Sequence, residues 1–408
     1  MALIVQKYGG TSVADAEKIR NVARRIVRAR DEGNQVVAVV SAMGDTTDDL
    51  LQLARRITGQ PSQRELDVLL STGEVVSSTL LAMALHGLDC PAVSLSGAQA
   101  GIRTDTAYSR ARIMNIDPKR IRRELEKDRV VIVAGFQGIT DEMDVTTLGR
   151  GGSDTTAVAL AASLGAETCD RYTDFEGIFT ADPRLVPKAR RLGDISYEEM
   201  LEMCTYGSKV IHPRAVELGE LFNIPILVAS SFNDRPGTLI RKEVIMEIRN
   251  KVRGIAQDLD VAKITVVGVP DHPGIAASIF TALAEAGVSV DTIVQNASVE
   301  HITDLTFTVA RSQLEAAMEV TRPIAESIGA RECASDAGLG KVSIIGTGMQ
   351  NAPGYAARMF RALSEQNINI QLISTAEIRI TCIIDEARVG DAVRALHRAF
   401  ELETAEPA

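Results

Sequence analysis

Two glycine-rich segments carry the residue types that proteins use to bind and transfer phosphate. Residues 7–12 read Lys-Tyr-Gly-Gly-Thr-Ser and stand between a short apolar run and an amphipathic segment, which predicts a turn from a strand into a helix. Gly9 and Gly10 permit a sharp turn, so successive backbone N–H groups can point at one anion beside the positive end of a helix. Lys7 adds a flexible point charge. The spacing favours a phosphate site over a tight turn with a surface lysine.

The second segment, residues 149–154, reads Gly-Arg-Gly-Gly-Ser-Asp and precedes an alanine-rich helical pattern. Arg150 offers a planar fork that matches a carboxylate. Asp154 stands at the predicted helix start, where the helix dipole stabilises an acidic side chain, so it is either part of a site or only a cap. Two such helix starts in one domain predict two anionic ligands that face each other, such as a phosphoryl donor and an acidic acceptor.

A third polar segment follows a predicted strand at residues 168–173. Residues 173–177 (Thr-Asp-Phe-Glu-Gly) and 180–184 (Thr-Ala-Asp-Pro-Arg) are expected in a loop at the carboxyl end of that strand, where ligands bind in open α/β sheets. The P-loop pattern, the dinucleotide fingerprint and the catalytic loop of protein kinases are absent from the sequence. The protein classes that depend on those motifs are therefore excluded.

Composition excludes further classes. The 408 residues carry a formal net charge of −10 and contain no Trp, which argues against nucleic-acid and anionic-membrane binding. The five histidines and five cysteines show no metal-ligand spacing and no Cys-x-x-Cys pair, so neither a protein metal site nor a disulfide framework is predicted. No apolar run seen in the sequence approaches the ~18 residues of a membrane span, and no signal peptide is visible. We therefore expect a cytoplasmic protein.

The elements that must hold these segments alternate between strands and helices up to about residue 230. Such alternation predicts an α/β domain with a mainly parallel sheet and helices on both faces. Strands are predicted at 3–5, 36–40, 92–95, 130–134, 168–173 and 226–229, and helices over 19–27, 50–57, 65–85, 154–164, 197–205 and 213–222.

Beyond Pro236-Gly237 the pattern changes to a charged segment, 241–253, that is predicted to be helical, and then to an internal repeat. Residues 264–268 (Ile-Thr-Val-Val-Gly) match 342–346 (Val-Ser-Ile-Ile-Gly), and a Pro-Gly pair follows each copy. Apolar positions such as Phe280 and Phe360 then recur in register. Each copy reads strand, Pro-Gly loop, helix, strand, strand, helix, which is the ferredoxin-like βαββαβ order.

Taken together, the ordered motifs resemble those of the aspartokinases. Residues 7–12 are similar to the Lys-[Phe/Tyr]-Gly-Gly-Thr-Ser opening of that family, and 149–154 follow in its order and spacing. The paired C-terminal copies resemble the tandem ACT domains of its monofunctional members. Further matches are Ser41-Ala42-Met43 with Thr47, Ser71-Thr72-Gly73-Glu74, Tyr172-Thr173-Asp174, the 180–184 segment and the Lys209-Val-Ile-His-Pro-Arg214 segment.

The resemblance implies an α/β fold in which an amino-acid-kinase (carbamate-kinase-like) parallel-sheet sandwich domain precedes two ferredoxin-like βαββαβ ACT domains. The implied boundaries are 1–245 for the kinase domain, 246–335 for the first ACT domain and 336–408 for the second. The implied activity is aspartate kinase: ATP-dependent phosphorylation of the L-aspartate β-carboxylate to 4-phospho-L-aspartate, the first step towards lysine, threonine, methionine and diaminopimelate. Mg²⁺ is expected to bridge ATP oxygens because no dedicated protein cage is visible.

The resemblance also implies residue roles. Lys7 and the Gly9 and Gly10 amides would stabilise the transferred phosphoryl group, Arg150 would hold the aspartate α-carboxylate, and Glu74 the α-ammonium. Asp154 would orient the cationic groups or magnesium, a choice left open. The implied ATP-binding set is Lys7, Tyr8, Gly9, Gly10, Ser41, Thr173, Asp174, Phe179 (where Tyr is usual), Asp182, Arg184 and Lys209, and the aspartate-binding set is Thr47, Glu74, Arg150, Gly151, Gly152 and Ser153.

Allosteric control is implied as well, because ACT pairs in this family bind small amino acids. Positions that match its effector contacts are Asp271, Asp291, Gln295, Asn369, Ile370 and Glu377. Lysine, threonine or both are the implied effectors, and a homo-oligomer assembled through the ACT domains is expected. Met246 stands where some relatives start a separate, truncated regulatory subunit, although an ordinary linker methionine is the alternative.

Two other functions fit part of the sequence. One is an amino-acid kinase that acts on glutamate, acetylglutamate or UMP, which the paired ACT copies and the context of Glu74 disfavour. The other is an amino-acid sensor with an inactive kinase domain, which the intact Lys7, Arg150, Asp154 and Lys209 disfavour.

Overall fold

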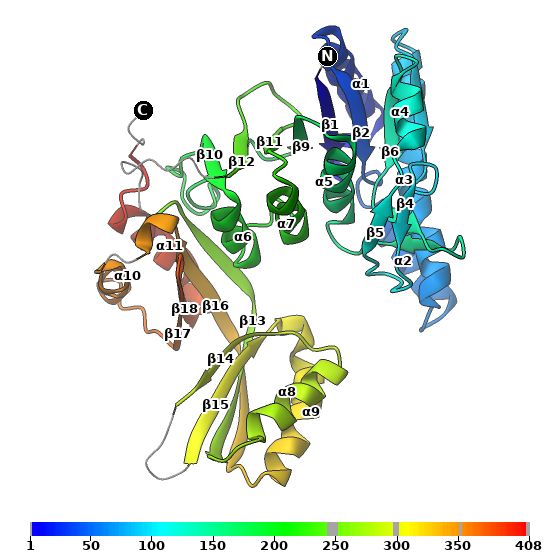
Figure 1. Cartoon of the computed structure of the whole chain (residues 1–408). Helices are drawn as coiled ribbons and strands as arrows, with labels where there is room; N and C mark the ends of the chain where they lie inside the picture. The colour runs from blue at the N-terminus through cyan, green and yellow to red at the C-terminus, as the bar shows by residue number, and fades with distance from the viewer. Residues whose placement is uncertain (1, 243–251, 297–301, 351–352, 405–408) are drawn as a thin grey trace. The chain divides into compact units, whose positions relative to one another are not determined.

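The computed structural model describes residues 2–242, 252–296, 302–350 and 353–404, which divide into two compact units (Figure 1). The first unit comprises Met1–Phe179, Arg191–Thr205 and Lys209–Glu247. The second comprises Thr180–Arg190, Tyr206–Ser208 and Ile248–Ala408. Two short segments that interrupt the first unit in sequence therefore belong with the second, a grouping that no local sequence pattern indicated.

An eight-stranded sheet forms the centre of the first unit, in the order β10-β12-β11-β9-β1-β2-β6-β3. Neighbouring strands pair in parallel except β11 and β12, which are antiparallel. The expectation of a mainly parallel sheet is thus confirmed. The strands are β1 (Leu3–Tyr8), β2 (Gln35–Val40), β3 (Ala92–Leu95), β6 (Val130–Ala134), β9 (Thr168–Thr173), β10 (Asp194–Ser196), β11 (Ile226–Ser230) and β12 (Thr238–Arg241).

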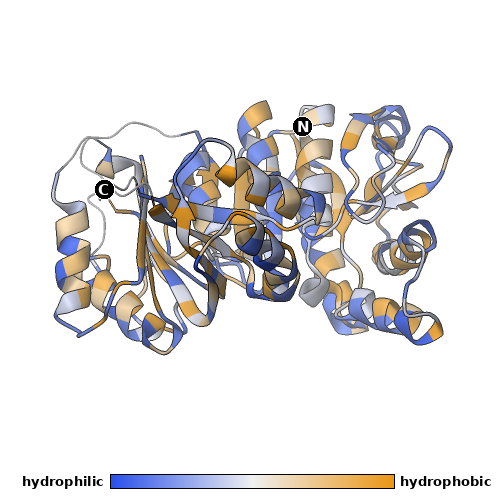
Figure 2. Ribbon diagram, turned by 90° about the horizontal axis from the view of Figure 1, so that it is seen from below, coloured by the Kyte–Doolittle hydropathy of each residue, from blue (hydrophilic) through white to orange (hydrophobic). Residues whose placement is uncertain are grey.

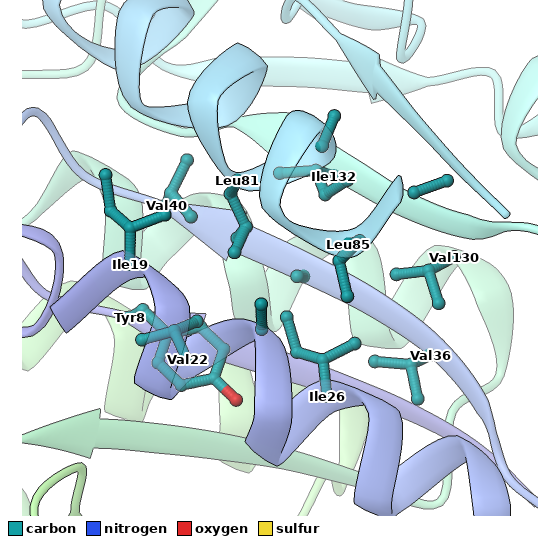
Figure 3. Close-up of a cluster of buried hydrophobic side chains, with 14 of the residues drawn as sticks. Tyr8, Ile19, Val22, Ile26, Val36, Val40, Leu81, Leu85, Val130 and Ile132 are labelled. Atoms are coloured by element: carbon teal, nitrogen blue, oxygen red, sulfur yellow. The ribbon is translucent and has the colours of Figure 1, made fainter. Parts of the chain in front are cut away.

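Helices cover both faces of this sheet. On one face, α1 (Ala16–Asp31) and α3 (Gln63–His86) place Ile26 and Leu85 against Val36 and Ile132 in a buried apolar cluster (Figure 3). On the other face, α5 (Gly152–Leu164) packs against β1, β2 and β9. The remaining helices of this unit are α2 (Thr46–Ile57), α4 (Lys119–Leu125), α6 (Tyr197–Thr205) and α7 (Pro213–Phe222).

Local chemistry accounts for these elements. β2 and β6 are continuous apolar runs because each lies between two other strands and is buried on both faces. Helix α1 begins where the Asp15 carboxylate accepts hydrogen bonds from the N–H groups of Glu17 and Lys18. Helix α7 has a proline at its first position and ends at Asn223 in the left-handed conformation.

A four-stranded sheet, in the order β5-β4-β7-β8, was not predicted. Its strands have three or four residues each, too few to show an alternating pattern. Its importance lies in position, because β8 leads directly into the glycine-rich segment at 149–154. The strands are β4 (Ile102–Thr104), β5 (Ile113–Ile116), β7 (Gln137–Ile139) and β8 (Val145–Thr147).

Helix α3 corrects the statement that no segment is long and apolar enough to span a membrane. Its 24 residues pass that test by length and hydropathy, but half of the apolar window is buried inside the protein. Leu81 and Leu85 pack against α1 and the central sheet. The apolar character of α3 is therefore explained by its place in the core of the first unit.

The second unit is built on a six-stranded sheet in the order β14-β15-β13-β16-β18-β17, with antiparallel neighbours throughout. Its helices carry both apolar and polar stretches along their length (Figure 2), as amphipathic helices with one face on a sheet must. The strands are β13 (Gly254–Pro270), β14 (Val290–Gln295), β15 (Ile302–Val309), β16 (Glu332–Ile345), β17 (Leu372–Ala376) and β18 (Arg379–Asp385), and the helices α8 (Ile275–Glu285), α9 (Leu314–Ser327), α10 (Tyr355–Ser364) and α11 (Val389–Ala399).

The two long strands β13 and β16 join two ferredoxin-like halves into this one sheet. Residues 262–270 of β13 and 332–336 of β16 complete the half that contains α8 and α9. In the other half, 339–345 of β16 pairs with β18 and also with 254–258 of β13. The fourth strand of the C-terminal half thus comes from chain that precedes the N-terminal half, which the repeat pattern did not indicate.

Three sequence predictions concern segments that lie partly or wholly outside the described residues, or a boundary inside a strand. The domain boundary after residue 245, Met246 itself and most of the helix expected over 241–253 lie outside the described residues. Arg241, the first residue of that helix prediction, ends strand β12 instead. The boundary after residue 335 falls inside β16.

The shared strand generates a stability prediction. Ile255 is buried among the side chains of the C-terminal half, so Ile255→Ala should destabilise that half by about 2–5 kcal/mol through the cavity that it leaves. Hydrogen exchange should then quicken at the amides of residues 342–345. The matched control is Ile264→Ala, which removes an equally buried side chain of the other half and should quicken exchange in β15. Protected 342–345 amides in Ile255→Ala would contradict the strand assignment.

Candidate active site

The site is built around Asp154, whose carboxylate is shared by two cations. Asp154 lies in the first turn of α5, and its Oδ1 is 2.6 Å from Lys7 Nζ and 3.1 Å from Arg171 Nε. Lys7 and Asp154 side chains are each only 6% exposed. Lys7 and Arg171 are direct neighbours on the parallel strands β1 and β9. Sequence analysis predicted Lys7 and Asp154 but missed Arg171, because no local motif reveals which residues pair across strands.

Burial and charge act in opposite directions on this cluster. Burial opposes ionisation of Asp154, but Arg171 and Lys7 outweigh it and hold the pKa of Asp154 far below its ordinary value. Burial lowers the pKa of Lys7 below its ordinary value, although the charge of Asp154 counteracts it. Asp154 is therefore a carboxylate at neutral pH and a poor proton acceptor.

Glycines allow the two predicted turns to approach their neighbours. A Cβ on Gly10 would lie 3.0 Å from the carbonyl oxygen of Ala42, so the 41–44 loop passes directly beside the first turn. Gly151 has φ +68°, and a Cβ there would lie 2.2 Å from the ring of His212. The amide of Gly9 donates to the carbonyl oxygen of Tyr172 at 3.3 Å. A role of that amide towards phosphate therefore stays a prediction.

Glu74 reaches the same region from α3. Its Oε1 accepts a hydrogen bond from the N–H of Ala42 at 3.1 Å, while Oε2 is buried with no hydrogen-bond partner among the described residues. Burial raises the pKa of Glu74 to about 7, although the N–H of Ala42 and the charge of Lys7 act in the other direction. An orphaned buried carboxylate oxygen next to Ser41 fits a cationic group such as an ammonium.

Asp67, two turns before Glu74 on the same face of α3, positions the Arg150 turn. It is fully buried and accepts four hydrogen bonds of 2.8–3.0 Å, two each from Thr147 and Ser109. Thr147 ends β8, and Ser109 O lies 3.0 Å from where a Cβ of Gly149 would stand. Sequence analysis missed Asp67, although an acidic residue inside the apolar run Leu66 to Leu70 was a signal.

The remaining predicted aspartate-binding residues lie in this turn and in the loop that contacts Gly10. Arg150 is exposed, Gly152 and Ser153 are buried, and Ser41 and Thr47 are half-buried in and beside the loop that contacts Gly10. Arg214 donates to the carbonyl oxygens of Leu148 and Ala111 at 3.0 Å each. The loop that carries Arg150 is therefore fixed from two sides while the Arg150 side chain itself remains at the surface.

The predicted ATP-binding residues are divided between the two units. Thr173 and Asp174 end β9 in the first unit and hydrogen-bond to each other at 2.9 Å. Phe179 and the exposed Lys209 also belong to the first unit. The Tyr8 ring is buried in the core (Figure 3). It stacks on Tyr172, which leaves only the main chain of Tyr8 for a ligand.

Asp182 and Arg184 belong to the second unit. Arg184 Nη2 lies 2.7 Å from Asp182 Oδ2, and Gln257 donates to the same oxygen at 3.4 Å. Their segment packs into the core of the C-terminal half through Ala181 and Val186. The structure thus places these two predicted residues with the regulatory repeat rather than with Thr173 and Asp174.

The predicted effector residues are surface residues of the second unit. Asp271, Gln295 and Asn369 are exposed, Ile370 is half-buried, and Glu377 accepts a hydrogen bond from Gln350 at 3.3 Å. Asp291 forms an ion pair with Lys341 of β16. Asn369 and Ile370 line a shallow surface hollow with Phe360 and Ser364. Within the described residues, no group of three or more His, Cys, Asp or Glu is arranged to hold a metal ion.

Comparison with known proteins agrees with this geometry. The amino acid kinase family matches residues 2–230, and the ACT domain matches residues 263–326 and 342–400, so the expected fold is confirmed. The aspartate kinase of Stutzerimonas stutzeri is 52% identical over 405 residues, which cover 99% of this chain and 98% of that protein.

Two solved structures of Escherichia coli aspartokinase III are similar over most of both chains. The complex with aspartate and ADP has a TM-score of 0.80 at 26% identity and covers 97% of this chain and 99% of its own. The complex with lysine and aspartate has a TM-score of 0.75 at 26% identity and covers 98% and 99%.

The hydrogen bonds of Asp67 generate the prediction of this subsection. Asp67→Asn leaves one amide NH₂ facing buried donors, so the free energy of unfolding should fall by about 2–4 kcal/mol, measured by urea denaturation. The matched control is Asp144→Asn, which changes a carboxylate that pairs with the exposed Arg64 and should cost less than about 1 kcal/mol. Equal losses for the two variants would contradict a special structural role of Asp67.

Proposed function

This chain belongs to the aspartokinase family, and from that membership we propose that it transfers the γ-phosphoryl group of ATP to the β-carboxylate of L-aspartate. The product is 4-phospho-L-aspartate, and the reaction is the first step of lysine, threonine and methionine biosynthesis. The observation that carries the proposal is the buried Lys7–Asp154–Arg171 cluster between a glycine turn and the first turn of α5. It supplies fixed positive charge where a phosphoryl group needs it.

Different residues of the chain bind the phosphoryl group and the aspartate. The β-carboxylate of aspartate is already ionised at neutral pH, so no general base is needed and the low pKa of Asp154 is no obstacle. Asp154 instead holds the Lys7 ammonium, which keeps two further N–H donors for phosphate oxygens. Arg150 binds the α-carboxylate of aspartate, and Glu74 binds its α-ammonium. Thr47 and the Gly151–Ser153 turn complete the aspartate site.

The nucleotide is held by residues after β9 and by Lys209. Thr173, Asp174, Phe179, Asp182 and Arg184 are the proposed contacts, together with Ser41 and the 8–10 turn. Mg²⁺, when bound to ATP, neutralises charge on the phosphates. The cluster of Lys7, Arg171 and Asp154 holds two cations and one carboxylate that both cations occupy, so a bound Mg²⁺ would depend on ATP and water for its ligands.

Regulation is proposed through the second unit. The ACT domains bind lysine, threonine or both, with contacts from Asp271, Asp291, Gln295, Asn369, Ile370 and Glu377. The sheet of this unit has two open edge strands, β14 and β17, which suit assembly into a homo-oligomer through the ACT domains. A truncated regulatory subunit that starts at Met246 and a cytoplasmic location belong to the same proposal. The domain boundaries proposed are 1–245, 246–335 and 336–408.

A hydroxamate assay for acyl phosphates tests the proposed activity. With ATP and Mg²⁺, the protein should form aspartyl hydroxamate, and glutamate should react at least about 100-fold more slowly because its carboxylate is displaced by one methylene. Lysine or threonine should lower the rate on aspartate. Lys7→Ala should lower kcat by about 10²–10³-fold in protein that circular dichroism shows to be folded. Absence of aspartyl hydroxamate with wild-type protein would defeat the proposal.

The raised pKa of Glu74 generates a pH prediction. The free enzyme loses the Glu74 negative charge as pH falls through about 7, so kcat/KM for aspartate should fall up to tenfold per pH unit below that value. Bound α-ammonium favours the carboxylate, so kcat itself should change less. Glu74→Gln should have a higher KM for aspartate and a flat profile between about pH 6 and 8. A flat wild-type profile would remove Glu74 from ammonium binding.

A further inference from the structure

Arg171 is the one member of the buried Lys7–Asp154–Arg171 cluster that lies in no sequence motif. It lies on β9 directly beside Lys7 of β1, and side chains at paired positions of parallel strands leave the sheet on the same face. Both therefore meet the same oxygen, Asp154 Oδ1, from adjacent strands. This geometry makes Arg171 part of the phosphoryl site although it stands outside the glycine-rich motifs.

An arginine at this position is costly for the fold. Its side chain is only 13% exposed; its Nε reaches Asp154, and its Nη1 is buried without a hydrogen-bond partner among the described residues. A buried donor without a partner is destabilising, and so is the burial of a charge, which the ion pair with Asp154 offsets only in part. The neighbours Val5 and Val228 show that an apolar side chain fits these strands. Stability alone therefore does not explain Arg171.

The net charge of the buried cluster gives a better reason for an arginine at position 171. Lys7 and Asp154 alone form a neutral pair, which offers little net attraction to a phosphoryl group. The guanidinium of Arg171 adds a second positive charge, so the buried group of three has a net charge of +1. The other titratable groups that act on Lys7 or Asp154 are Glu74 of α3, Cys169 of β9 and His212 before α7.

We propose that Arg171 is a positioning residue for phosphoryl transfer: it binds Asp154 from β9, so that Asp154 orients Lys7 without neutralising the positive charge that Lys7 presents to phosphate. The inference rests on the proposed function, because it names a further residue of the same site. In this arrangement Asp154 is a fixed anion that binds both cations. Arg171 acts through Lys7 and does not contact the substrate.

Steady-state kinetics of three variants test the inference. Arg171→Met keeps the length of the side chain without its charge, and kcat should fall about 10–100-fold while KM for aspartate stays within about threefold. Arg171→Lys restores the charge and should recover kcat to within about fivefold of wild type. Arg103→Met is the matched control, because it removes a half-buried arginine of the small sheet and should leave kcat unchanged.

The outcomes distinguish a failure of the proposed activity from a failure of the role given to Arg171. Formation of aspartyl hydroxamate by wild type tests the proposed function, whereas the ratios between variants test Arg171. A kcat for Arg171→Met within twofold of wild type would overturn the inference, and so would a folded Arg171→Lys that is as slow as Arg171→Met. If circular dichroism shows that Arg171→Met is not folded, Arg171→Gln replaces it in the same comparison with the same criteria.

Discussion

The first unit depends on one carboxylate that two cations share. Asp154 can hold both Lys7 and Arg171 only because β1 and β9 are adjacent and parallel in the register that pairs these residues. Burying three charges is expensive unless each is compensated, so the strands, the first turn of α5 and the site must form together. The register of the parallel sheet therefore sets the geometry of the proposed phosphoryl site.

The long helix α3 positions the residues proposed to bind aspartate, again through buried carboxylates. Asp67 and Glu74 are seven residues apart and lie on one face, so one helix fixes two loops that are distant in sequence. Asp67 holds Thr147 and Ser109 below the Arg150 turn, and Glu74 holds Ala42 beside Gly10. The loops proposed to bind aspartate are thus held in position by buried carboxylates.

Sequence reasoning succeeded where the signal is local. The apolar runs at 36–40 and 130–134 and the helical periods of α6 and α7 were predicted closely because burial imposes a pattern on consecutive residues. The three-residue strands β4, β7 and β8 are too short for such a pattern. Arg171 and residues 254–258 depend on pairing between distant strands, which no motif records.

The second unit includes part of the predicted nucleotide site in its own core. Thr180 accepts a backbone hydrogen bond from Ile255 at 2.8 Å, and its Oγ1 is 2.9 Å from the buried His397 Nε2 of α11. Ala181 and Val186 then pack with the apolar side chains of the C-terminal half. Asp182 and Arg184 stand between these anchors, so any rearrangement of that half changes their surroundings directly. The segment that carries the proposed nucleotide contacts Asp182 and Arg184 is itself anchored in the core of the C-terminal half, so an effector bound to that half would act on this segment without an intermediate element.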